Sequence, residues 1–187
     1  MKPGLRLVLA AACAAVLGLG ARAWYESRQP DLPPPMPVPE GVRVAAPGER
    51  PEPIRLPDLD GNIVELAAIA PGRPLLVNVW ASWCGPCVAE MPELQGFAET
   101  QGDDGVQVVG LALDEVEAVR AFLRQVPVGY PILLDSPGPA DASVLLGNTR
   151  GLLPYSVLLD AQRRVVRQKL GPFAPGEIES WARPGGE

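Results

Sequence analysis

The feature that most constrains the fold is an apolar run that leads directly into a pair of cysteines. Residues 74–80 read PLLVNVW, and the following ASWCGPC contains Cys84 and Cys87. A short, continuous apolar run predicts a strand buried on both faces, as in a sheet with helices on each side. From Pro86 to Gln101, apolar residues recur at helical spacing. We therefore predict a buried strand, then the cysteines, then a helix that begins at them.

The rest of the chain alternates between strand and helix patterns. Two short strands with a turn at Asp60-Gly61 are predicted within residues 54–66. Asp114 is the expected N-cap of a helix over 114–126, and Pro92 is expected to kink the cysteine-bearing helix. Further strands are predicted over 106–113, 131–135, 155–160 and 163–170, and further helices over 140–147 and 174–182. This order predicts an α/β fold with a central mixed sheet flanked by helices, whose last two strands form an antiparallel hairpin.

The first 25 residues have the pattern of a targeting segment, with positive charges followed by an apolar stretch. Three interpretations stay open. A secretory peptide is cleaved after Ala21-Arg22-Ala23, or residues 5–25 are retained as a membrane anchor, or Cys13 is lipidated after cleavage. Each of them places the rest of the chain outside the cytoplasm.

Residues 26–53 are predicted to be a proline-rich linker. Nine prolines fall between Pro30 and Pro53, a composition that favours extended polyproline II over hydrogen-bonded structure. The segment is either a spacer or a disordered linker. The folded domain is predicted to span residues 54–187.

Three uses of the cysteine pair can be compared. A structural zinc site needs four Cys or His ligands, whereas the chain has three cysteines and no histidine. A purely structural bridge between Cys84 and Cys87 closes a very small loop and removes little entropy from the unfolded chain. Thiol–disulfide exchange fits best, and no metal or other cofactor is expected beyond the redox-active Cys84–Cys87 disulfide.

The position of the two cysteines at the start of the predicted helix indicates which one attacks the substrate and which one resolves the mixed disulfide. Cys84 lies where unpaired backbone N–H groups and the helix dipole favour thiolate over thiol, so it is the predicted nucleophile. Cys87, one turn deeper, faces the same side and is predicted to resolve the mixed disulfide. Pro86 lies in the first turn of the predicted helix, where a backbone N–H would have no acceptor within the helix.

The stretch VNVWASWCGPCVAEMPEL resembles the active-site strand and helix of the thioredoxin superfamily, in particular the TlpA/ResA-like thiol–disulfide oxidoreductases of the bacterial periplasm. The resemblance implies a thioredoxin fold with an extra N-terminal β-hairpin and an inserted βα unit at 106–125. It also implies a cis Pro154 facing the cysteines, with the backbone of Leu153 pairing with substrate. Trp83, Gly85 and Pro86 are the remaining predicted substrate-binding residues.

Three positions bear on the mechanism that the resemblance implies. Asn78 stands where thioredoxin has a buried aspartate. Glu90 matches a glutamate thought to assist proton transfer in ResA-like proteins, against the alternative of a solvated helix residue. Tyr155 replaces the usual threonine after the cis-proline, which leaves the substrate contact surface open.

Without a histidine to stabilise its thiolate, the chain is predicted to be a reductant. The resemblance implies oxidised protein substrates such as apocytochrome c, a membrane electron donor of the DsbD/CcdA type, and a periplasmic location tethered by the N-terminal segment. The formal charge of -6 argues against nucleic acid as a partner. Two alternatives are a tethered binding or chaperone module, and a peroxiredoxin, whose peroxidatic motif is absent because Val77 lies seven residues before Cys84.

Overall fold

The computed structural model describes residues 18, 20, 22 and 32–183, and the chain divides into two compact units, Met1–Pro34 and Pro35–Glu187. The predicted targeting segment, residues 1–25, lies outside the described residues except at positions 18, 20 and 22. Among the described residues, no helix combines the length and the apolar character needed to cross a membrane.

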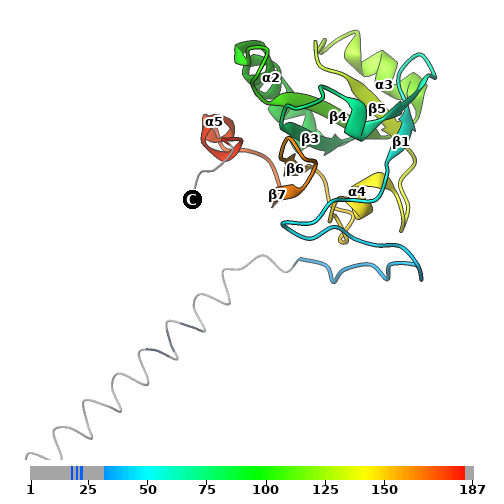
Figure 1. Ribbon diagram of the computed structural model, residues 1–187, viewed down its shortest axis with the longest axis vertical. Helices are drawn as coiled ribbons and strands as arrows, with labels where there is room; N and C mark the ends of the chain where they lie inside the picture. The colour runs from blue at the N-terminus through cyan, green and yellow to red at the C-terminus, as the bar shows by residue number, and fades with distance from the viewer. Residues whose placement is uncertain (1–17, 19, 21, 23–31, 184–187) are drawn as a thin grey trace, which may run out of the picture. The chain divides into compact units, whose positions relative to one another are not determined.

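A five-stranded mixed sheet forms the centre of the second unit, with strand order β5-β4-β3-β6-β7 (Figure 1). β3 (Leu75–Trp80) runs parallel to β4 (Gln107–Leu113), which runs parallel to β5 (Ile132–Asp135). On the other side, β3 pairs antiparallel with β6 (Tyr155–Leu159), and β6 pairs antiparallel with β7 (Val165–Leu170). All six residues of β3 are buried, as the apolar run predicted.

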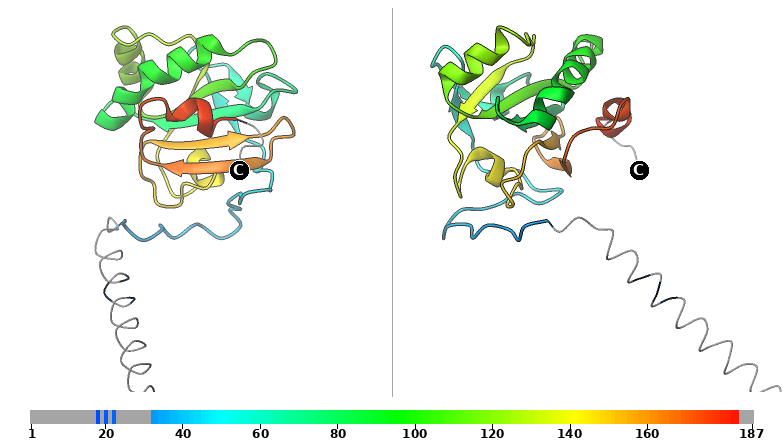
Figure 2. Two further views of the ribbon diagram at one scale, coloured as in Figure 1. Left: turned by 90° about the vertical axis from the view of Figure 1, so that its left-hand side faces the viewer. Right: turned by 180° about the vertical axis from the view of Figure 1, so that it is seen from behind.

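Alternate residues of β3 enter two separate cores, because successive side chains of a strand point to opposite faces. Leu76 and Trp80 pack with residues of α2 (Gly85–Thr100), α3 (Val116–Leu123) and α5 (Glu177–Trp181). The odd-numbered residues of β3 pack with α4 (Ala142–Leu145) and the 3-10 helix η1 (Leu66–Ala68). α5 lies beside α2 on the first face (Figure 2). The cysteine-bearing helix α2 thus packs on the first core, and α5 covers part of the same core.

The predicted hairpin before the sheet is present as β1 (Arg55–Pro57) and β2 (Ile63–Glu65), which form their own two-stranded antiparallel sheet. Its turn is held by Asp58, whose Oδ1 accepts hydrogen bonds from the backbone N–H groups of Asp60 and Asn62 at 2.8 and 2.9 Å. Gly61 adopts a φ of 85°, which glycine tolerates without strain.

Residues 35–53 belong to the compact unit, which begins at Pro35 and not at the predicted boundary before residue 54. Ala45 is buried, and its N–H donates to the carbonyl of Leu145 at the end of α4. Gly48 donates to the Val165 carbonyl, and Val165 donates back to Glu49, so the segment covers the start of the edge strand β7. The prolines prevent ladder pairing of the segment, but its other amides bind the domain.

α2 runs from Gly85 to Thr100 with Pro92 inside the helix. One local prediction about the helices needs correction. The N-cap of α3 is Glu115 and makes no side-chain cap bond. Asp114 lies one residue before it and accepts hydrogen bonds from Ser82 instead.

Candidate active site

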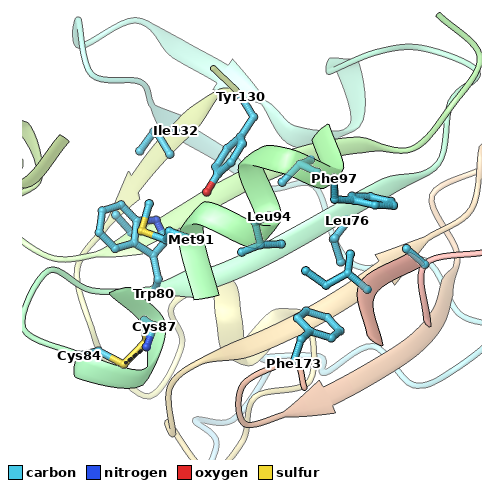
Figure 3. Close-up of a cluster of buried hydrophobic side chains, with 14 of the residues drawn as sticks. Leu76, Trp80, Cys84, Cys87, Met91, Leu94, Phe97, Tyr130, Ile132 and Phe173 are labelled. Carbon is cyan, nitrogen blue, oxygen red and sulfur yellow. Dashed lines mark hydrogen bonds between the residues drawn. A yellow bond between two sulfur atoms is a disulfide. The ribbon is translucent and has the colours of Figure 1, made fainter. Parts of the chain in front are cut away.

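Cys84 and Cys87 form a disulfide at the start of α2, with their Cα atoms 5.3 Å apart. Cys84 is the N-cap residue, and its Sγ accepts a hydrogen bond of 3.3 Å from the backbone N–H of Cys87 (Figure 3). Cys84 keeps 6% of its surface exposed, whereas Cys87 is fully buried. The structure therefore places the Cys84 sulfur at the N-terminus of α2, where it accepts a backbone N–H, and buries the Cys87 residue completely.

The residues next to Cys84 in the chain are exposed. Trp83 exposes 69% of its surface, so its side chain is not packed into the core. Gly85 and Pro86, in the first turn of α2, are also exposed. Their exposure leaves all three accessible to a substrate, and their role in substrate binding stays a prediction.

The peptide bond between Leu153 and Pro154 is cis, as the resemblance implied. Leu153 is half-buried and packs against the core that contains both cysteines. Tyr155 belongs to the opposite core, and its hydroxyl donates to the Leu146 carbonyl at 3.1 Å. The tyrosine side chain therefore contributes nothing to the surface beside the cysteines.

Glu90 is buried, with 4% of its surface exposed, so the solvated-residue interpretation is wrong. Its Oε1 accepts a hydrogen bond of 2.8 Å from the Asn78 side chain, and its Oε2 accepts one of 3.0 Å from the backbone N–H of Phe173. Burial raises the pKa of Glu90 above its ordinary value, although both hydrogen bonds and the charge of Lys169 oppose the shift. The helix thus carries a protonatable carboxyl one turn beyond Cys87.

Asn78 connects this carboxyl to the sheet. Its Nδ2 also donates to the Ser156 hydroxyl at 3.1 Å, while its Oδ1 accepts no hydrogen bond from any described residue. Asn78 is buried and cannot ionise, so the ionisable group at this place comes from the helix and not from the strand.

Comparison with known proteins identifies the chain. Residues 36–182 match the family described as Redoxin. The chain belongs to the Redoxin family. Within it, the chain is 30% identical over 126 residues to a thiol-disulfide oxidoreductase ResA of Bacillus cereus, an alignment that covers 66% of this chain and 69% of that protein. It is 28% identical over 114 residues to the sporulation thiol-disulfide oxidoreductase A of Bacillus subtilis, covering 59% and 67% of the two chains.

Solved structures agree on the fold of this Redoxin-family chain. StoA from Bacillus subtilis superposes with a TM-score of 0.57 at 24% identity, over 73% of this chain and all of that one. A DsbF homologue from Corynebacterium diphtheriae gives a TM-score of 0.61 at 24% identity, over 77% and 94% of the two chains. Together with the Cys84–Cys87 disulfide, the relatives show that the chain is a TlpA/ResA-like thiol–disulfide oxidoreductase with a thioredoxin fold.

Two groups at the site of this Redoxin-family enzyme were not predicted from the sequence. Lys169 lies 2.8 Å from Glu177 and 5.5 Å above the Phe173 ring, so it holds in place the segment that donates to Glu90. Asp114 is bound to Ser82, two residues before Cys84. Both groups are far from the cysteines in sequence, and no local pattern indicates them.

Trp80 is a core residue, in agreement with the buried strand predicted over residues 74–80. Its ring is fully buried among the core side chains (Figure 3). The centroid of the ring lies 5.2 Å from that of Phe122. Gly110 on β4 makes room for the indole, because a Cβ there would lie 3.1 Å from Trp80 Nε1. Within the described part of the chain, no three His, Cys, Asp or Glu side chains are grouped so as to hold a metal ion.

Proposed function

We propose that this oxidoreductase reduces disulfide bonds of proteins outside the cytoplasm, using the dithiol form of Cys84 and Cys87. The observation that carries the proposal is the unequal placement of the two sulfurs. One caps a helix and receives its amide, and the other is fully buried, with the Glu90 carboxyl one helical turn further on. An attacking and a resolving thiol need these two different environments.

The exchange proceeds in two displacements. The Cys84 thiolate attacks one sulfur of the substrate disulfide, forms a mixed disulfide and releases the first substrate thiolate. Cys87 then loses its proton and attacks the Cys84 sulfur, which forms the Cys84–Cys87 disulfide and releases the second substrate thiolate. Two electrons pass from the chain to the substrate, and an external dithiol must return them.

Glu90 is proposed to take the proton from Cys87. Both residues are buried and lie three positions apart on α2, so they share one face of the helix. Burial raises the pKa of Glu90 above its ordinary value and so brings it closer to that of a thiol, which favours proton exchange between the two groups. The Glu90→Gln variant should change the pH profile of thiol reactivity, measured as iodoacetamide alkylation of the reduced protein; an unchanged profile removes Glu90 from the proton transfer.

The direction of electron flow is proposed from the residues beside the sulfurs. Gly85 and Pro86 separate the cysteines, and the chain has no histidine to stabilise the reduced form as strong oxidants do. The gap between thioredoxin-like and DsbA-like potentials is about 150 mV, or about 7 kcal/mol. Equilibration with defined thiol–disulfide buffers should place the protein nearer the thioredoxin end, and a potential near that of DsbA would refute the proposed direction.

The insulin reduction assay tests the activity directly. With a recycling reductant, the wild-type chain should reduce insulin disulfides, and Cys84→Ser should abolish turnover. Cys87→Ser should accumulate mixed disulfides, since the resolving thiol is missing. Absence of both turnover and trapped substrate would contradict the proposal.

We further propose that the substrates include apocytochrome c or other oxidised envelope proteins. The proposed donor is a membrane carrier of the DsbD/CcdA type, and the proposed location is the periplasm, with a tether to the inner membrane. The ResA relatives support this proposal. Mass spectrometry of proteins trapped on Cys87→Ser in cells identifies the substrates, and fractionation of a tagged chain tests the tether.

A second function is favoured by the exposure of Trp83, which gives the site an apolar surface fit for binding without chemistry. In that case the chain is a tethered binding or chaperone module. The Cys84→Ser variant separates the two functions, because a module that only binds would keep suppressing aggregation of an unfolded client.

A further inference from the structure

The loop that carries the nucleophile is tied to the neighbouring strand by one carboxylate. Ser82 lies between β3 and Cys84, and two of its groups donate to the same oxygen of Asp114. The backbone N–H lies 2.9 Å from Asp114 Oδ2, and the hydroxyl lies 2.5 Å from it. The other oxygen, Oδ1, accepts the N–H of Glu115 at 2.8 Å.

This contact extends the pairing of β3 with β4 beyond the ends of both strands. The last parallel pair is Trp80 with Ala112, and Ser82 and Asp114 each lie two residues further along. A side-chain carboxylate therefore accepts the bond that a backbone carbonyl would accept within the sheet. Hydrogen bonds to a charged acceptor are stronger than those to a neutral one.

The tied residue lies inside the turn that delivers Cys84. The N–H of Cys84 donates to the carbonyl of Ala81 at 3.1 Å, so Ser82 and Trp83 are the two inner residues of this turn. Trp83 is mostly exposed, and its burial contributes little to holding the loop. The bonds from Ser82 are thus the polar contacts that fix the turn to the sheet.

The ordinary role of an aspartate at this place is to cap the following helix, and the structure does not give Asp114 that role. The N-cap of α3 is Glu115, and the only bond that Asp114 accepts from the described residues at the start of α3 comes from the N–H of Glu115, before the helix begins. Of the three hydrogen bonds that Asp114 accepts from described residues, two come from Ser82.

We propose that Asp114 is a positioning residue for the nucleophilic sulfur. By holding Ser82, it fixes the turn so that Cys84 Sγ meets an incoming disulfide along the line of the sulfur–sulfur bond that breaks. Holding the nucleophile in this orientation lowers the barrier for its attack on the substrate disulfide. The inference rests on thiol–disulfide exchange at Cys84, and it holds for either direction of electron flow.

The test compares two reagents on the reduced full-length chain. Reduction of native insulin requires an aligned attack on a polypeptide disulfide. Iodoacetamide is small, and its rate of alkylation depends mainly on the fraction of thiolate. The variants are Asp114→Ala, Asp114→Asn and Ser82→Ala, and the matched control is Glu115→Gln, which removes an exposed carboxylate one residue further along.

Asp114→Ala is expected to slow insulin reduction about tenfold, the loss of about 1.4 kcal/mol of transition-state stabilisation, while alkylation changes less than about twofold. Asp114→Asn keeps an acceptor and should recover most of the rate. Ser82→Ala keeps the backbone bond, should lose about threefold, and should lose nothing more in the Asp114→Ala background.

Two results would overturn the assignment. In one, Asp114→Ala, or Ser82→Ala if the Asp114→Ala variant does not fold, reduces insulin as fast as Glu115→Gln. In the other, Asp114→Ala lowers the rates of insulin reduction and of alkylation by the same factor and also lowers the unfolding midpoint. That result would indicate a contact that only stabilises the fold. A wild-type chain inactive on insulin would refute the proposed function instead, and the variants would then be compared by glutathione disulfide exchange, with the same expected differences.

Discussion

The buried carboxyl of Glu90 predicts a dependence of stability on pH that one substitution removes. Burial raises its pKa in the folded protein above the ordinary value of 4.5. The folded state therefore binds the proton more tightly than the unfolded chain does. Stability from this group is complete below the unfolded pKa and is lost as the pH rises through the folded pKa. The oxidised wild-type protein should thus lose stability over this interval, and Glu90→Gln should lose less.

The hydrogen bonds around Glu90 set the size of the effect. In Glu90→Gln, Oε1 can still accept from the Phe173 N–H, and Nε2 needs an acceptor. Asn78 Oδ1 supplies one if the amide turns over, and the Ser156 hydroxyl can then donate to the same oxygen. We expect a change within about 1 kcal/mol at low pH. In Glu90→Leu, the Phe173 N–H and an Asn78 N–H lose their acceptor, which costs roughly 2–6 kcal/mol in total.

Urea unfolding of the oxidised protein, followed by tryptophan fluorescence, measures these differences at about pH 5 and about pH 8. The wild-type free energy of unfolding should fall between the two conditions relative to that of Glu90→Gln. Glu90→Leu should be the least stable protein at the lower pH. If the wild type and Glu90→Gln run parallel across the whole range, the buried carboxyl is not the source of the pH dependence and the reasoning is wrong.

Three further substitutions test other parts of the fold by the same unfolding measurement. Gly110→Ala places a Cβ 2.5 Å from Ile132 Cδ1 beside the Trp80 indole, so we expect a loss of about 1–3 kcal/mol and slower insulin reduction. Arg163→Met removes the guanidinium that bonds the carbonyls of residues 67, 69, 70 and 73, and should cost about 1–3 kcal/mol without changing exchange rates. Tyr155→Phe should cost about 1 kcal/mol and leave the KM for insulin unchanged, because the hydroxyl faces away from the cysteines.

The parts of the site that sequence could predict are those whose signal is local. The apolar run of β3 and the start of α2 lie next to each other in the chain, and the resemblance supplied the cis peptide at Pro154. Their geometry depends on neighbours within a few residues or on one motif. The predicted α/β order of strands and helices agreed with the structure for the same reason.

Contacts between distant segments could not be predicted in this way. The prolines of residues 35–53 indicate that the segment cannot form a ladder with itself, but they do not show that Ala45 and Gly48 will bind α4 and β7. Glutamates are rarely buried, and what buries Glu90 is the Phe173 segment, which lies 83 residues further along the chain. Asp114 had a local explanation as a helix cap, and the structure used it for a bond across the sheet.

The Asn78 side chain can form a hydrogen bond with Glu90 in either of the two protonation states of the carboxyl. The Asn78 amide presents Nδ2 to the carboxylate at 2.8 Å, and after a half-turn it presents Oδ1 to the protonated acid. An aspartate at position 78 would set two carboxyls against each other, and such a pair shares its protons in two coupled steps. With asparagine there, the proton that Cys87 is proposed to release has one acceptor, and a hydrogen bond between that acceptor and the strand persists while the acceptor changes charge.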